Sequence, residues 1–119
     1  MIKKNRGFTR VVKAGMYSYK GLIAAFRNEA AFRQELAIAV ILIPLAFWLE
    51  VTKLERIVLI AMVIMVLIVE LLNSGIESVV DRVGYEHHEL AGRAKDMGSA
   101  AVLLSLGLLL FVWIGIVLF

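Results

Sequence analysis

Polar residues that can carry out acid–base or metal chemistry recur at helical spacing inside an otherwise apolar stretch of this chain. Glu70, Asn73 and Glu77 are spaced i, i+3 and i+7, so a helix places them on one face, which Asp81 continues. A carboxylate within a membrane-spanning helix costs a few kcal/mol on insertion and therefore needs a partner or a task. We expect Glu70, the deepest of them, to be functional. The structural alternative is an interhelical hydrogen bond that fixes packing.

A second carboxylate group suggests phosphate chemistry. Mg²⁺ is a hard cation that binds carboxylate oxygens together with the phosphate oxygens of a nucleotide. Glu29 precedes the first long apolar segment, and the topology derived below puts it on the same side of the membrane as Glu77. The two could meet around one metal ion. Glu29 could equally be a solvated charge at the end of a helix.

The polar stretch before the last apolar segment holds further candidates. His87 and His88 lie between Glu86 and Glu89, and Lys95 follows. Adjacent histidines diverge by about 100° on a helix, and the chain has two histidines in all, so contact with a nucleotide fits better than a transition-metal site. The chain has neither a G-x-x-x-x-G-K-[ST] loop nor a G-x-G-x-x-G loop, so any phosphoryl transfer must be organised differently.

Composition sets the environment of these residues. Hydrophobic residues make up 61% of the 119 residues, and the mean hydropathy is +0.88. A water-soluble domain of this size has too little interior for so much apolar side chain, which favours a bilayer or a fully buried subunit. The chain has no cysteine, which excludes disulfides and thiolate metal sites. We find no removable signal sequence, so insertion should use the spanning helices themselves.

The hydrophobic pattern predicts an all-α membrane protein with one domain over residues 1–119. Residues 8–27 place apolar side chains at i, i+3, i+4 spacing with basic residues between them, as in an amphipathic helix that lies on a membrane surface. An ordinary helix packed on a partner is the alternative. Three spans follow at about 30–49, 55–80 and 96–119, with Pro44 inside the first. Gly84 and Gly92 are expected to form turns in the linker 82–95.

Charge predicts the orientation. Eleven Lys and Arg residues lie in the N-terminal segment and the 82–95 linker, whereas the opposite side has only Lys53 and Arg56. The positive-inside rule therefore places the N-terminus and this linker in the cytoplasm. With three spans, the C-terminus would be periplasmic.

Several motifs together resemble the Gram-negative type of bacterial integral membrane diacylglycerol kinases. They are G-F-T-R at 7–10, N-E-A-A-F-R-Q-E at 28–35, V-E-L-L-N-S-G-I-E-S-V-V-D-R at 69–82 and H-E-L-A-G-R-A-K-D-M-G-S-A-A at 88–101. The resemblance covers nearly the whole chain. It implies a homotrimer with active sites shared between subunits at the inner membrane, which transfers the γ-phosphate of ATP to diacylglycerol, gives phosphatidic acid and returns diacylglycerol to phospholipid synthesis.

The same resemblance implies roles for individual residues. Glu70 would be the general base, Asn73 would orient it, and Glu29 and Glu77 would hold Mg²⁺. The residues implied to contact ATP are Arg10, Tyr17, Glu29, Glu77, Glu86, His87, His88, Lys95 and Asp96. The residues implied to contact lipid are Arg10, Ala14, Ser18, Ala31, Gln34, Glu35, Trp48, Arg56, Glu70, Ser99 and Trp113.

Three alternatives remain at this stage. Undecaprenol could replace diacylglycerol as the lipid alcohol, as in related Gram-positive enzymes. A small proton-coupled exporter could use Glu70 alone, although the acidic residues cluster toward one side of the membrane rather than at its middle. The third alternative is a non-catalytic packing subunit.

Overall fold

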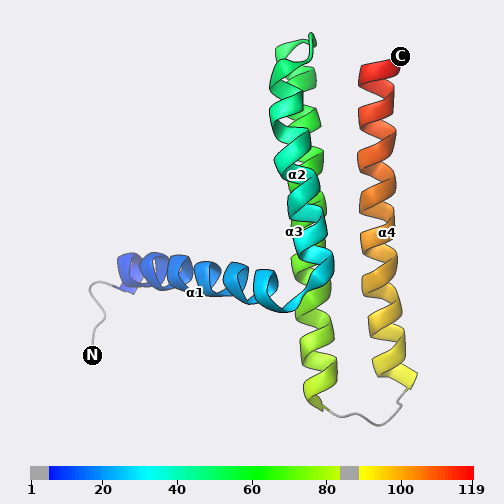
Figure 1. Cartoon of the computed structure of the whole chain (residues 1–119). Helices are drawn as coiled ribbons and strands as arrows, with labels where there is room; N and C mark the ends of the chain where they lie inside the picture. The colour runs from blue at the N-terminus through cyan, green and yellow to red at the C-terminus, as the bar shows by residue number, and fades with distance from the viewer. Residues whose placement is uncertain (1–5, 84–88) are drawn as a thin grey trace.

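The computed structural model describes residues 6–83 and 89–119, which form four α-helices (Figure 1). The helices are α1 (Arg6–Asn28), α2 (Ala30–Trp48), α3 (Lys53–Val83) and α4 (Glu89–Leu118). The last three are long enough and apolar enough to cross a membrane. The predicted all-α class with three candidate spans is therefore confirmed.

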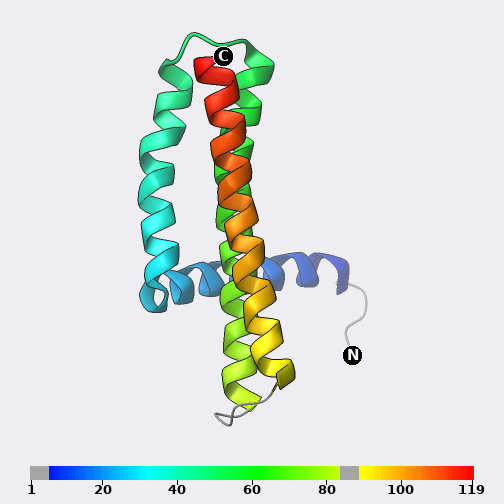
Figure 2. The same cartoon turned by 90° about the vertical axis from the view of Figure 1, so that its right-hand side faces the viewer.

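The four helices do not run in the same direction. α2, α3 and α4 lie side by side as an upright bundle, whereas α1 runs across the bundle (Figures 1 and 2). α1 crosses below the middle of the bundle, so the last turns of α3 and the first turns of α4 extend past it (Figure 1). The structure thus has a long apolar bundle on one side of α1 and a short helical extension on the other.

The core of the bundle forms around α3, which packs against both α2 and α4. Leu59, Val63 and Val66 of α3 are buried against small alanines of α2 and against Leu109 and Trp113 of α4. The indole Nε1 of Trp113 donates a hydrogen bond of 3.0 Å to the Leu59 carbonyl oxygen. This contact fixes α4 to α3 near the C-terminal end of the chain.

Side chains close the α2–α3 corner. Thr52 and Glu55 form a capping box at the start of α3, with reciprocal hydrogen bonds of 3.0 and 3.1 Å. Arg56 donates to the carbonyl oxygens of Ala46 and Leu49, both at 2.9 Å, at the end of α2. Carbonyls at a helix end have no partner within the helix. Arg56 satisfies the Ala46 carbonyl and adds a second donor to the Leu49 carbonyl, which also accepts from the Val51 backbone N–H at 3.1 Å.

The helix bounds differ from the sequence prediction at the linker. α3 continues to Val83 and α4 already begins at Glu89, so Gly92 is helical and the prediction of a turn there was wrong. The sequence prediction ended the helices where the apolar segments end, but polar residues continue both helices beyond that point. The other predicted turn, Gly84, lies outside the described residues.

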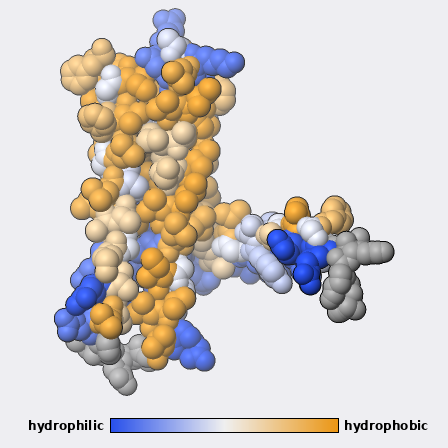
Figure 3. All heavy atoms as spheres, turned by 180° about the vertical axis from the view of Figure 1, so that it is seen from behind, coloured by the Kyte–Doolittle hydropathy of each residue, from blue (hydrophilic) through white to orange (hydrophobic). Residues whose placement is uncertain are grey.

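The outer surface of the bundle is apolar. Hydrophilic residues gather at the two ends of the bundle and along α1, and the face between them is mainly hydrophobic (Figure 3). Large side chains such as Val40, Phe47, Leu104 and Phe111 are well exposed on α2 and α4. A continuous apolar surface of this kind requires lipid or a protein partner around it.

The two tryptophans provide a matched test of the packing at the end of the bundle where α2 joins α3, called the far end below. Trp113 is 9% exposed and hydrogen-bonded, whereas Trp48 is 80% exposed. Trp113→Phe removes one interhelical hydrogen bond and should lower the free energy of unfolding by about 0.6–1.7 kcal/mol in a bilayer-like medium. Trp48→Phe should have no measurable effect. Unfolding by denaturing detergent, followed by circular dichroism, measures both, and equal losses would contradict the assignment.

Candidate active site

Four carboxylates lie near one another where α1, α2 and α3 meet. Glu70 is only 4% exposed, and the charges of Glu29, Glu35 and Glu77 are all close enough to act on it. Asn73 and Ser74 are buried beside Glu70 on α3. The predicted stripe on α3 thus faces other helices of the protein, and residues from α2, from α3 and from the position between α1 and α2 contribute to one acidic cluster.

Local helical geometry orients two of these carboxylates. Ser74 Oγ donates to Glu70 Oε2 at 3.4 Å, and Asn73 Nδ2 donates to Glu77 Oε2 at 3.5 Å. Both pairs are spaced i, i+4, the spacing at which side chains on one helical face meet. Both bonds are long, so they restrict the carboxylates without using up their capacity to accept from a ligand.

An elbow between α1 and α2 brings Glu29 to this cluster. Glu29 is the one residue between the two helices, and its backbone is extended, with φ −116° and ψ 108°. It occupies the N-cap position of α2, but its carboxylate makes no capping hydrogen bond. The carboxylate therefore remains available to a ligand at a helix N-terminus.

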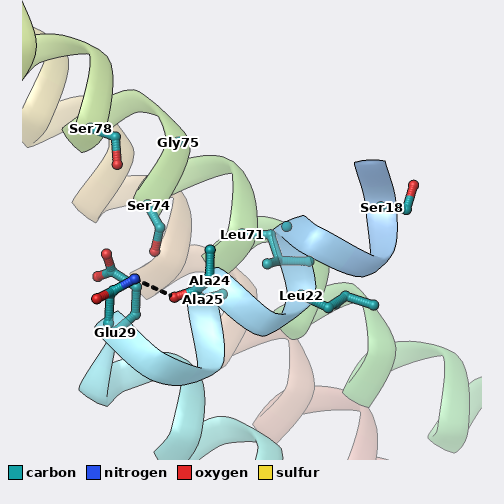
Figure 4. Close-up of a pocket in the computed structure, with 11 residues that line it drawn as sticks. Ser18, Leu22, Ala24, Ala25, Glu29, Leu71, Ser74, Gly75 and Ser78 are labelled. Carbon is teal, nitrogen blue, oxygen red and sulfur yellow. Dashed lines mark hydrogen bonds between the residues drawn. The ribbon is translucent and has the colours of Figure 1, made fainter. Parts of the chain in front are cut away.

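An open pocket of about 680 Å³ lies between α1 and α3. Its walls are lined by Ser18, Gly21, Leu22, Ala24, Ala25, Asn28 and Glu29 of α1 and the elbow, and by Leu71, Ser74, Gly75 and Ser78 of α3. Figure 4 shows Glu29 across from Ser74, with Ser78 further along the same wall. The small residues leave space between the two helices at a point where polar side chains line the gap.

The donor set fits Mg²⁺ bound together with a nucleotide. Within residues 6–83 and 89–119, no three His, Cys, Asp or Glu side chains form a ready-made metal cage. Mg²⁺ commonly uses one or two carboxylates plus phosphate oxygens and water. The close approach of Glu29 and Glu77 to Glu70 supplies carboxylate oxygens of the required type, without a complete protein cage.

The junction of α3 and α4 beside the cluster is tight. The Asn73 side-chain oxygen is buried without a hydrogen-bond partner among the described residues, and a Cβ built on Gly98 of α4 would collide with it. Glycine is thus required for this close approach. One turn further out, Lys95 Nζ and Asp81 Oδ1 form an exposed ion pair of 2.8 Å.

The remaining candidate residues fall into three groups. The α1 candidates are exposed along that helix, and Ser18 also lines the pocket; they are Arg10, Ala14, Tyr17 and Ser18. Ala31, Gln34, Asp96 and Ser99 are exposed, near the level of the acidic cluster. Glu86, His87 and His88 lie outside the described residues. The assigned roles of all these residues stay predictions.

Three lipid-contact candidates lie far from the acidic cluster. Arg56 and Glu70 are fourteen residues apart on α3, or about 21 Å along the helix. Trp113 packs beside Leu59, and Trp48 ends α2 at the same far end. Any lipid that reaches both ends would therefore lie along the bundle, with its polar part at one end only.

Sequence reasoning missed two residues that the structure links to the cluster. Ser74 lies one turn after Glu70, and the i, i+4 spacing could have identified it. Arg33 of α2 donates to the carbonyl oxygens of Phe26 and Arg27 at 2.7 and 3.2 Å across the elbow. No spacing rule could have found that contact, because it depends on the direction in which the chain turns at Glu29.

Known proteins resemble this chain over almost its full length. The family described as prokaryotic diacylglycerol kinase matches residues 16–117. A diacylglycerol kinase of Escherichia coli (strain K12) is 54% identical over 113 residues, which cover 95% of this chain and 93% of that protein. The diacylglycerol kinases of Haemophilus influenzae and Pseudomonas aeruginosa are 52% and 50% identical over 116 residues, which cover 98% of this chain and 98% and 94% of those proteins.

Glycine 98 provides a test of the α3–α4 junction. Gly98→Ala forces a methyl group against the Asn73 side chain and should destabilise the protein by about 1–3 kcal/mol. Gly107→Ala on the same helix meets no neighbouring atom within 4 Å and should be neutral or slightly stabilising. Thermal unfolding in detergent compares the two variants. An equal response at both positions would show that the junction is not tightly packed.

Proposed function

The chain belongs to the prokaryotic diacylglycerol kinase family, and on that premise we propose that it transfers the γ-phosphate of ATP to the hydroxyl of diacylglycerol. The product would be phosphatidic acid, which returns diacylglycerol to phospholipid synthesis. The observation that carries the proposal is identity of 50–54% to curated diacylglycerol kinases over nearly the whole chain. The acidic cluster around Glu70, beside an open pocket, is the site that fits this reaction.

Glu70 is the general base in this proposal. It would accept the proton of the lipid hydroxyl as the oxygen attacks the γ-phosphorus of ATP, whose bond to the bridging oxygen of ADP breaks. Its burial and its hydrogen bond from Ser74 support the role, because a base must be held within hydrogen-bond reach of the proton it removes. Asn73, one turn along, would help to orient the acidic groups.

Glu29 and Glu77 would hold Mg²⁺, which neutralises phosphate charge when bound. Arg10, Tyr17, the residues Glu86 to His88, Lys95 and Asp96 would contact ATP. Lys95 is paired with Asp81 at 2.8 Å on an exposed surface, where an ion pair is weak. A nucleotide phosphate could therefore recruit Lys95 at small cost.

The proposed site lies at membrane-surface depth. We propose that α1 lies along the inner leaflet of the inner membrane as an amphipathic helix, with the N-terminus cytoplasmic and the C-terminus periplasmic. The direction of α1 across the bundle and its exposed apolar and basic residues support this arrangement (Figure 1). The pocket beside Leu71 and Ser74 then opens at headgroup level, where the glycerol hydroxyl of the lipid already lies.

The lipid would contact residues from all four helices. These are Arg10, Ala14, Ser18, Ala31, Gln34, Glu35, Glu70 and Ser99 near the polar end, and Trp48, Arg56 and Trp113 toward the other end. We further propose a homotrimer with active sites shared between subunits. The exposed apolar surface of α2 and α4 supports an assembly, because part of it can be covered by neighbouring copies.

The alternatives receive no support from the comparisons, since the curated relatives named above are diacylglycerol kinases. An exporter would also place its essential carboxylate nearer the middle of the bilayer.

A coupled ATPase assay in mixed micelles tests the proposed function. ADP release should require both Mg²⁺ and diacylglycerol, and labelled phosphate should appear in phosphatidic acid. Undecaprenol offered at the same mole fraction should be a poor substrate. A clear preference for undecaprenol would overturn the substrate, and uptake of a dye into vesicles driven by protons without ATP would support the exporter.

Paired variants test the division of roles. Glu70→Gln should lower turnover by about 10²–10⁴-fold, because it removes the base while keeping the size of the side chain. Glu77→Gln should instead raise the Mg²⁺ requirement. Circular dichroism and the assembly state should stay unchanged in both. Full turnover of the Glu70 variant would favour a packing role for that residue, and unaltered metal dependence of the Glu77 variant would refute its role as a ligand.

A further inference from the structure

The elbow between α1 and α2 depends on few interactions. Glu29 is the only residue between the two helices, and Ala25, near the C-terminal end of α1, is the one residue of that helix that is buried. The direction of α1, and with it the position of Glu29, must therefore be fixed at the elbow.

The hydrogen bonds of the last turn of α1 identify what fixes it. The last four carbonyls of a helix have no partner within the helix. In α1, the Ala25 carbonyl accepts from the Glu29 backbone N–H at 2.9 Å. The next two, of Phe26 and Arg27, both accept from Nη1 of Arg33. Arg33 belongs to the first turn of α2, so its guanidinium joins the end of one helix to the start of the next.

The Arg33 guanidinium also stabilises the charge at the C-terminal end of α1. The C-terminus of a helix carries partial negative charge, which a guanidinium stabilises. The backbone N–H of Arg33 donates to the Glu29 carbonyl at 3.2 Å, so Arg33 binds Glu29 itself as well as two residues that precede it. The far corner uses the same chemistry, because Arg56 of α3 binds the carbonyls of Ala46 and Leu49 at the end of α2.

We propose that Arg33 is a positioning residue that, by bonding Phe26 and Arg27 across the elbow, sets the angle of α1 and holds Glu29 against the acidic cluster of α3. The proposal rests on the proposed function only for its kinetic consequence, which is that Arg33 acts on metal binding through Glu29. Arg33 itself touches neither the metal nor the nucleotide in this scheme.

Spin-label distances test the geometry without any need for activity. The chain has no cysteine, so Lys13→Cys on α1 and Ile41→Cys on α2 provide two clean, exposed labelling sites. Labelled protein in bilayers, diluted with unlabelled protein so that each assembly holds one labelled copy, should give one narrow distance distribution. Arg33→Ala should broaden or shift it, and Arg33→Lys, which keeps a cationic donor with shorter reach, should give an intermediate result.

Arg27 offers a matched control. Arg27→Gln removes a positive charge from the same elbow, but the Arg27 side chain has no hydrogen-bond partner among the described residues, and its backbone carbonyl remains bound to Arg33. The distance distribution of this variant should match that of the parent. An unchanged distribution in Arg33→Ala, or an equal change in Arg27→Gln, would overturn the proposal.

The kinetic arm measures the consequence for the site. Loss of a residue that orients a metal ligand typically costs about 10–100-fold in metal affinity. Arg33→Ala should raise the half-saturating Mg²⁺ concentration by about tenfold or more, with the KM for diacylglycerol unchanged and partial rescue in Arg33→Lys. If Arg33→Ala instead binds metal-free ATP more weakly and its α1–α2 distance is unaltered, Arg33 contacts the phosphate directly, which would overturn the positioning role. If Glu29→Gln leaves the Mg²⁺ dependence unchanged, the metal role of Glu29 fails, and the distances still decide the role of Arg33.

Discussion

The arrangement of this protein depends on a carboxylate, Glu70, that is buried within a helix otherwise suited to the interior of a membrane. Such a group is expensive in an apolar environment, so the fold must surround it with polar partners or place it at the edge of the bilayer. The structure supplies polar partners, and the proposed position of α1 along the membrane surface would add the second. Ser74 hydrogen-bonds the carboxylate, and α1 turns away from the bundle at the same level, so that an open pocket with polar walls reaches the α3 helix there. The carboxylate is only 4% exposed, yet the adjacent residues Leu71 and Ser74 line the open pocket.

The elbow at Glu29 explains how a chain of 119 residues forms a site from so few elements. A straight continuation from α1 into α2 would carry Arg10 to Asn28 away from α3. The extended backbone of Glu29 changes the direction of the chain, so that α1 crosses the lower part of α3 (Figure 2). The Glu29 carboxylate makes no capping hydrogen bond. The resulting contact uses small residues such as Ala25 and Gly75, which leave space between the helices rather than filling it.

Much of this organisation was predictable from sequence, and the remainder shows where pattern reasoning ends. The helical stripe from Glu70 to Glu77 and the three apolar spans follow from periodicity and hydropathy, which are local properties of the chain. The close approach of Gly98 to Asn73 and the bonds of Arg33 depend on how helices are placed relative to one another, which no local period specifies. Gly92 illustrates the opposite error, because glycine in a polar stretch is typical of a turn, yet here it continues α4.

The two ends of the bundle differ in how completely their buried polar side chains are hydrogen-bonded. At the far end, Arg56, the Thr52–Glu55 capping box and the Trp113 indole satisfy backbone or side-chain groups, and no buried side-chain N or O atom among the described residues there lacks a hydrogen-bond partner. At the near end, by contrast, side-chain oxygens of Glu35 and Asn73 remain enclosed without partners. Buried polar atoms are almost always hydrogen-bonded in folded proteins, so each unpaired one needs an explanation, and a role in ligand binding or catalysis is one of them. The unpaired oxygens therefore distinguish the end that holds the proposed site from the end at which α2 and α3 join, and they do so independently of any sequence motif.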